Sequence, residues 1–237
     1  IIEGDGETLR PLSSLTRAET AVILINAVDS VNPSANQGGM QPPSGNMPGG
    51  FGGSDTVTQG TSATTITEDG TYSSTSYSST GDDENALRVD GATVTLDSVT
   101  VDKSAGSSSN TEDGDFYGQN ASLLATNGAN VTIKNATLNS SAQNGNGIFS
   151  YGTGTTVNVS DSTITTTADN SGGIQTTGGG TTNATNLTVN TSGNSAAAIR
   201  SDRGGGTVVV DKGTYTSNDY NSPAVYSTAD VTVSNAT

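Results

Sequence analysis

Two acidic clusters are the places where this sequence could hold a metal ion. One is Asp82-Asp83-Glu84, and the other is Glu112-Asp113-Gly114-Asp115. Several carboxylates on one flexible loop suit Ca²⁺, which prefers oxygen ligands. Neither cluster fits the twelve-residue calcium-loop pattern, so a solvated acidic loop is the favoured interpretation. We predict no cofactor, and we name Asp113 and Asp115 as the candidate ligands should calcium bind.

Groups for acid–base catalysis are scarce. The chain has no His and no Cys, which excludes Ser–His–Asp and Cys–His chemistry within it and removes thiolate metal sites. A polysaccharide lyase could instead combine calcium with a basic side chain, and the bases available are Lys103, Lys134, Arg200, Arg203 and Lys212. They form no evident constellation with the carboxylates. We therefore predict no catalytic residue and no enzymatic activity, with a lyase-type carbohydrate-active enzyme as an alternative.

A threonine column is the sharpest regularity of the sequence. It comprises Thr71, Thr100, Thr137, Thr163, Thr188, Thr214 and Thr237. Alternation along a strand places these side chains on the outer surface, where a ladder of β-branched residues stabilises a sheet. An ice-binding face would need a second matched column, and the neighbouring outward column is mixed. We interpret the ladder as structural.

The threonines belong to a repeat that predicts their arrangement in space. Each copy reads apolar, polar, apolar, two turn residues, small, Thr, apolar, as in Val131-Thr-Ile133-Lys-Asn-Ala136-Thr137-Leu138. Copies begin at residues 65, 94, 131, 157, 182, 208 and 231. Period-2 alternation indicates a strand with one buried face, and Asn or Asp suits the tight corner that follows. An additional short apolar strand precedes most copies.

Repeats of about 25 residues predict a solenoid of stacked coils. We expect an all-β fold over residues 62–237, a right-handed parallel β-helix of about seven coils, each with about three short strands. The spacing between the second and third copies is longer, because of an insertion from Asp102 to Asn120. Inserted loops on such a scaffold often carry function.

Composition agrees with a narrow core and limits the partners. Hydrophobic residues make up 30% of the chain and aromatic residues 4%, too few to fill a spherical interior of this size. The net charge of −15 repels nucleic acid and anionic membrane surfaces. No apolar run is long enough to span a membrane.

The N-terminal region predicts a helix followed by a linker. Thr16 and Glu19 form a capping box before an apolar run, so the helix should end near residue 30, before Asn32-Pro33. Residues 1–31 thus form a helical segment. Residues 32–61 are rich in Gly, Pro and Ser and are expected to be a flexible linker.

This N-terminal segment resembles a known family. Gly4-Asp5-Gly6, Leu9-Arg10-Pro11 and Thr16-Arg17-Ala18-Glu19 are similar to the C-terminal half of an S-layer homology repeat, over residues 1–30. The resemblance implies attachment to a cell-wall polysaccharide, with Arg17 and Glu19 as the candidate binding residues. The first helix of the repeat is absent, and the family usually needs three repeats. Residues 62–237 resemble, in general style, the β-helical repeats of bacterial surface adhesins.

These patterns lead to a functional hypothesis. We expect an extracellular, wall-anchored structural or adhesive protein of a bacterial cell surface, with a β-helical stalk and a cell-wall, host or environmental glycan as partner. Both ends of the sequence look cut, and an uncapped coil exposes strand edges. Self-association through coil ends is therefore expected in the alternative, a self-assembling filament or lattice subunit.

Overall fold

The computed structural model describes residues 2–4, 9–11 and 56–237. The predicted helix at 16–30, Arg17, Glu19 and most of the predicted linker at 32–61 lie outside these ranges. Near the N-terminus, strand β1 (Ile2–Gly4) pairs antiparallel with β2 (Leu9–Pro11). Both strands fall within the stretch that resembles half an S-layer homology repeat.

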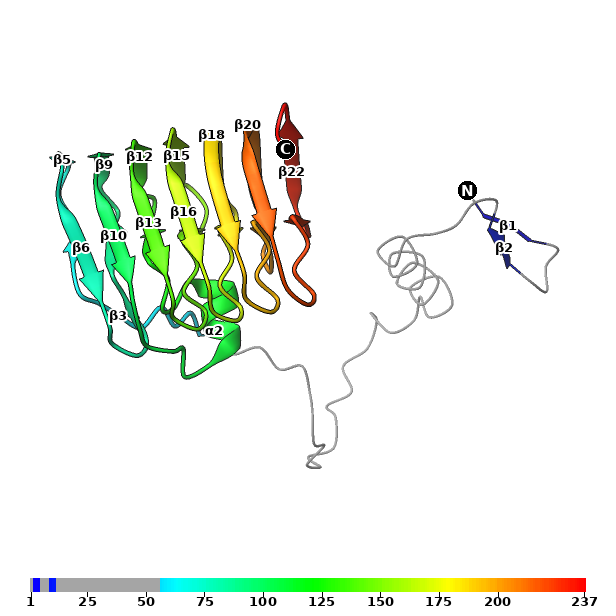
Figure 1. Cartoon of the computed structure of the whole chain (residues 1–237), viewed down its shortest axis with the longest axis horizontal. Coiled ribbons are helices and arrows are strands. Elements are labelled where there is room, and N and C mark those ends of the chain that lie inside the picture. The colour runs from blue at the N-terminus through cyan, green and yellow to red at the C-terminus, as the bar shows by residue number, and fades with distance from the viewer. Residues whose placement is uncertain (1, 5–8, 12–55) are drawn as a thin grey trace, which may run out of the picture. The chain divides into compact units, whose positions relative to one another are not determined.

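Residues 56–237 form a parallel β-solenoid of about seven coils, which confirms the predicted fold class. Figure 1 shows the strands of successive coils side by side in chain order, from β5 in cyan to β22 in red. In the first four coils two strands each lie in the larger of the two sheets, whereas β18 and β20 are single long strands that cover both positions. The described strands of this sheet are β5 (Gly70–Ser73), β6 (Ser76–Ser79), β9 (Thr93–Asp97), β10 (Thr100–Lys103), β12 (Asn130–Lys134), β13 (Thr137–Ser140), β15 (Thr156–Ser160), β16 (Thr163–Thr166), β18 (Gly180–Thr191), β20 (Gly206–Ser217) and β22 (Asp230–Ser234).

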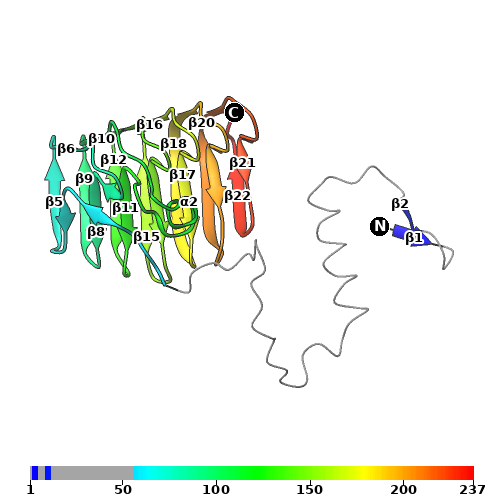
Figure 2. The same ribbon diagram turned by 90° about the horizontal axis from the view of Figure 1, so that it is seen from below.

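A second parallel sheet forms another face of the solenoid (Figure 2). Its described strands are β4 (Thr65–Ile66), β8 (Leu87–Asp90), β11 (Leu123–Thr126), β14 (Ile148–Tyr151), β17 (Ile174–Thr177), β19 (Ile199–Ser201) and β21 (Val225–Tyr226). Strand β3 (Thr61–Ser62) pairs with β7 (Glu84–Asn85), so the last residues of the predicted linker already join the solenoid. Within the described part of the chain, no helix is long and apolar enough to cross a lipid bilayer.

The core is a set of columns, because each strand pairs in register with its copy in the next coil. Leu96, Ile133 and Val159 are register partners on β9, β12 and β15, and each is at most 2% exposed. Side chains next to them in sequence point outward, which explains the predicted alternation. Some buried polar side chains pair with one another, as do the hydroxyls of Thr176 and Thr182, 2.7 Å apart, whereas the buried hydroxyls of Tyr77 and Tyr215 have no hydrogen-bond partner among the described residues.

The corners are also stacked, as the sequence indicates. The corner residues Asn135, Asp161 and Asn186 have φ between 49° and 54°, a left-handed conformation that Asn and Asp tolerate better than most residues. Their side chains join coil to coil: Asn186 Nδ2 donates to Asp161 Oδ1 at 2.7 Å, and Asn135 Nδ2 donates to Asp97 Oδ1 at 3.1 Å.

The predicted alignment of the first copy at residue 65 is wrong. Gly70 and Tyr72 are the register partners of Val94 and Leu96, so the first copy begins at residue 70. Residues 65–66 instead form β4, which pairs with the strand that precedes the second copy. Two nearby alternating strings, Thr65-Ile-Thr67 and Gly70-Thr-Tyr72, both fit the start of a copy, and only the pairing between coils distinguishes them.

We predict that Leu138→Ala lowers the free energy of unfolding by about 2–5 kcal/mol, because it opens a cavity in a fully buried column. Chemical denaturation monitored by circular dichroism measures this change. The matched control is Thr137→Ala on the exposed side of the same strand, with an expected change within about 0.5 kcal/mol. Equal effects of the two substitutions would contradict the assignment of inner and outer faces.

Candidate functional site

The inserted segment after β10 contains helix α2 (Thr111–Tyr117). The Asn110 side chain caps its N-terminus by accepting from Glu112 N at 3.0 Å, and Gly118 ends it with φ at 80°. A helix of seven residues is unstable by itself, because nucleation is unfavourable and few hydrogen bonds follow it. Contacts with the solenoid must therefore hold α2 in place.

Helix α2 lies over the outer face of the sheet that contains β11 and β17 (Figure 2). Outward-pointing residues on these strands form a register column that runs from Leu124 through Phe149 and Gln175 to Arg200. Leu124 and Phe149 are fully buried although they point away from the core. A Cβ at Gly118 would lie 2.7 Å from Leu124 Cδ1, so glycine is needed for this close approach.

Side chains of the solenoid satisfy the last carbonyl groups of α2. Gln59 Nε2 donates to Tyr117 O at 2.9 Å, Thr177 Oγ1 donates to Phe116 O at 2.6 Å, and Gln175 Nε2 donates to Asp115 O. Carbonyl groups at a helix end have no partner within the helix, and leaving them buried and unpaired is costly. These bonds fix the position of the helix against separate coils.

An ion pair joins α2 to β19. Arg200 Nη1 and Nη2 each lie 3.3 Å from an oxygen of Asp115, and Nη2 also lies 2.8 Å from Asp202 Oδ2. Arg200 is 9% exposed. Burial opposes the charge on Arg200, but Asp115 and Asp202 outweigh it and raise its pKa above the ordinary value. Burial raises the pKa of Asp115, against the opposing effect of Arg200.

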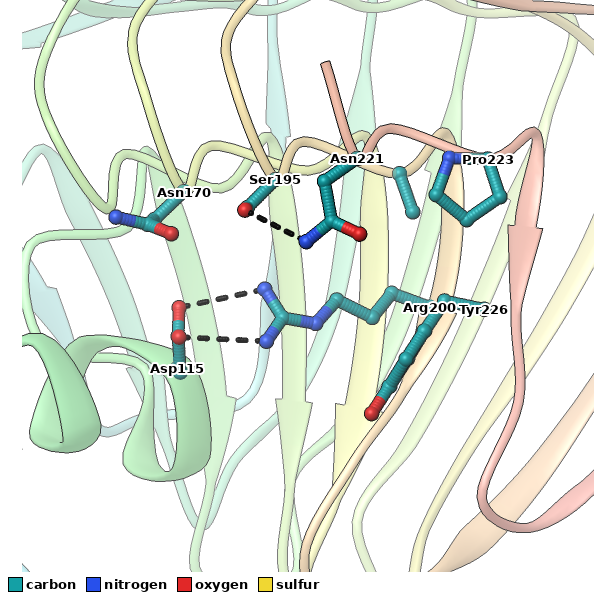
Figure 3. A pocket seen from close by; sticks show the side chains of 8 residues that line it. Asp115, Asn170, Ser195, Arg200, Asn221, Pro223 and Tyr226 are labelled. Carbon is teal, nitrogen blue, oxygen red and sulfur yellow. Dashed lines mark hydrogen bonds and ion pairs between the residues drawn. The ribbon is translucent and has the colours of Figure 1, made fainter. Parts of the chain in front are cut away.

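A cavity of about 220 Å³ lies beside this ion pair. Figure 3 shows Arg200 between Asp115 and Tyr226, with Asn170, Ser195 and Asn221 along one side. The Arg200 guanidinium carbon is 5.6 Å from the centre of the Tyr226 ring, within range of a cation–π contact. The cavity thus combines an aromatic ring, a charged pair, amides and a hydroxyl.

The polar side of the cavity is part of a second corner ladder that the sequence interpretation missed. Asn144, Asn170, Ser195 and Asn221 have φ near 56°, and Asn221 Nδ2 donates to Ser195 Oγ at 3.1 Å. The signal was present, because each of these residues stands four positions before an apolar residue that starts a strand: Ile148, Ile174, Ile199 and Val225. The Asp115–Arg200 pair had no such signal.

The threonine ladder stacks as predicted except in the first coil. Thr100, Thr137, Thr163, Thr188 and Thr214 are successive register partners, and Thr237 hydrogen-bonds across the Thr214 position, with Thr237 N donating to Gly213 O at 3.0 Å. Thr71 instead pairs with Thr95, and Ser76 stands beside Thr100. Including Thr71 in the ladder was therefore wrong, for the same reason as the alignment of the first copy. These side chains are exposed.

The two candidate calcium ligands, Asp113 and Asp115, lie in different surroundings. Asp113 is 8% exposed, and burial raises its pKa. Asp115 is engaged by Arg200 and accepts from Asn144 Nδ2 at 3.0 Å. Among the residues that the structure describes, no three acidic side chains gather to hold a metal ion. The expectation of no cofactor, with Asp113 and Asp115 as the candidate ligands should calcium bind, stays a prediction from the sequence.

The basic residues considered for lyase chemistry are scattered. Lys103 is fully buried, where its Nζ donates to Ser79 Oγ at 3.2 Å and to Gly81 O. Burial lowers the pKa of Lys103, although Glu84, Asp82 and Asp83 partly offset this effect. Lys134 pairs with Asp97 at 3.1 Å on an exposed corner. Lys103 lies inside the coil, so a polymer cannot reach it.

Comparison with protein-family models, curated proteins and solved structures finds no match for this chain. The S-layer homology resemblance therefore rests on the sequence alone.

We expect Arg200→Ala to loosen α2, because it leaves the Asp115 carboxylate buried without its charge partner. Loss of one member of a buried pair typically costs about 3–5 kcal/mol. Hydrogen exchange of the amides of residues 113–119 should accelerate while the core strands stay protected. The control is Arg203→Ala, whose guanidinium lies 4.0 Å above the Phe116 ring on the exposed side of α2. Equal acceleration in both variants would refute a holding role for the ion pair.

Proposed function

We propose that this chain is a structural and adhesive protein of a bacterial cell surface, anchored to the wall through its N-terminal region and carrying a binding site on a rigid solenoid. The observation that supports binding is the cavity beside Arg200. Inter-coil hydrogen bonds and α2 fix its walls, and its lining mixes apolar and polar groups, as ligand sites do. The β-solenoid supports only the scaffold part of this proposal.

Extracellular location is consistent with the composition. The net charge of −15 favours solubility and disfavours nucleic acid as a partner. Wall anchoring is supported by the resemblance of residues 1–30 to part of an S-layer homology repeat. The expected partner for that region is a cell-wall polysaccharide, with Arg17 and Glu19 in the binding role.

The two alternatives gain less support. Lyase activity would need a base beside acidic groups in a cleft, but Lys103 is buried and Arg200 is paired with Asp115. Lys134 pairs with Asp97 on an exposed corner, away from the cavity beside Arg200. A self-assembling subunit remains an expectation from the sequence. Negative-stain imaging separates the proposals, because a surface stalk gives dispersed short rods and an assembly subunit gives filaments or sheets.

We predict that the purified chain co-sediments with Gram-positive wall fragments that retain their secondary polysaccharide, and that Arg17→Ala reduces the bound fraction severalfold. The reason is that a guanidinium pairs with an anionic glycan in a charge-assisted bond. Lys212→Ala is the control, since it removes the same charge from an exposed corner of the solenoid. Wall fragments stripped of the polysaccharide should bind neither the unmodified chain nor its variants.

Absence of sedimentation by the intact chain would overturn the anchoring proposal. Equal losses in the Arg17 and Lys212 variants would show only a general charge effect and would remove Arg17 from the binding role.

A further inference from the structure

The cavity beside Arg200 presents hydrogen-bonding groups of both kinds. The side-chain amide of Asn170, at the edge of the cavity, makes no hydrogen bond to another described residue and offers two N–H donors and an acceptor. A guanidinium has five N–H donors, so the contacts of Arg200 with Asp115 and Asp202 leave some free. Asp115 supplies acceptor oxygens. A ligand with several hydroxyl groups, each able to donate and accept, matches this set.

The charge at the cavity disfavours an acidic ligand. Two carboxylates, Asp115 and Asp202, surround the single guanidinium of Arg200 at 2.8–3.3 Å. The two carboxylates and the guanidinium together carry a charge of −1, and the chain as a whole is strongly acidic. An acidic ligand, such as a carboxylate, sulfate or phosphate, would compete with Asp115 and Asp202 for Arg200. The negative charge of these two carboxylates would also repel it.

The lining of the cavity includes apolar groups, among them the planar ring of Tyr226. Tyr226 is 43% exposed and its ring stands beside Arg200 (Figure 3). Pro223 and Ala197 also line the cavity. A pyranose ring has a face of C–H groups and a rim of hydroxyls. It can therefore place its C–H face against Tyr226 while its hydroxyls reach Asn170, Arg200 and Asp115.

The size of the cavity sets the length of the ligand. Its volume of about 220 Å³ is below the range of about 300–1,000 Å³ that is typical of drug-sized sites. It has room for a single sugar ring, and the remainder of an oligosaccharide would extend into solvent.

We propose that the cavity lined by Asn170, Arg200 and Tyr226 binds one uncharged pyranose unit of a glycan. This assignment deepens the proposed adhesive function and rests on it for its biological meaning. The sugar stacks on Tyr226 and forms hydrogen bonds with the side chains of Asn170, Arg200 and Asp115. The buried Arg200–Asp115 pair holds these groups in position before the ligand arrives.

The test is a titration of the ¹⁵N-labelled full chain, followed by amide chemical shifts. The probes are methyl glucoside, methyl galactoside and methyl N-acetylglucosaminide, with methyl glucuronide as the charged match of the first. At millimolar concentrations, at least one neutral glycoside should shift the amides of residues 170, 195–200 and 226. The glucuronide should bind at least about tenfold more weakly, which corresponds to about 1.4 kcal/mol.

Variants assign the site. Tyr226→Ala should weaken binding about tenfold or more, whereas Tyr226→Phe, which keeps the ring, should bind as the parent does. Asn170→Gly should also weaken binding, because glycine keeps the left-handed backbone but lacks the amide. The matched control is Asn186→Gly, which makes the same change at φ 54° on the other corner ladder. Circular dichroism confirms that each variant is folded.

Each outcome separates this proposal from the adhesive function. No shift at these residues with any neutral glycoside, or tighter binding of the glucuronide, would overturn the cavity assignment. Glycoside binding that survives Tyr226→Ala would overturn it too, while co-sedimentation with wall fragments, which is assigned to the N-terminal region, should survive that substitution. Localised shifts in a chain that binds neither wall fragments nor oligosaccharides would support the cavity and count against adhesion.

Discussion

The structure depends on one constraint, which is that each coil must hydrogen-bond to the next in register. Parallel strands repeat at about 4.8 Å, so every position along a coil becomes a column shared by all coils. A residue that suits a position in one coil must therefore suit its neighbours above and below. Leu96, Ile133 and Val159 share the core in this way, and Asn186 and Asp161 share a corner.

The same constraint explains where function can arise. Inside the columns little can vary, because a coil has a narrow core and tight corners. Variation is tolerated where the chain leaves the coil, as it does between β10 and β11. The inserted segment contains α2. The outward-pointing residues that it covers, Leu124 and Phe149, are apolar, and Arg200 lies at the edge of the helix. The cavity exists where this cover ends.

The sequence was enough to predict the features that repeat. Period-2 alternation gave the strands, Asn and Asp gave the first corner, and the common spacing gave the parallel stacking. The first coil was misaligned because its apolar residues, Ile66, Tyr72 and Tyr77, fit the pattern in two registers. The candidate site was beyond reach, because Asp115 and Arg200 are 85 residues apart and neither belongs to the repeating pattern. Apolar Leu124 and Phe149 at outward positions were the available sign that something covers that face.

Helix α2 has a consequence for how the solenoid yields to force. In a simple stack each coil is coupled only to its neighbours, so coils can peel away one at a time from an end. Through Gln59, Asn144, Thr177 and Arg200, the segment around α2 is tied to strands or corners of several coils at once. Unfolding that starts at the C-terminal coils must therefore break the contacts of α2 before β19 can separate from its neighbours. A solenoid held in this way would resist a pulling force in one larger step instead of many small ones.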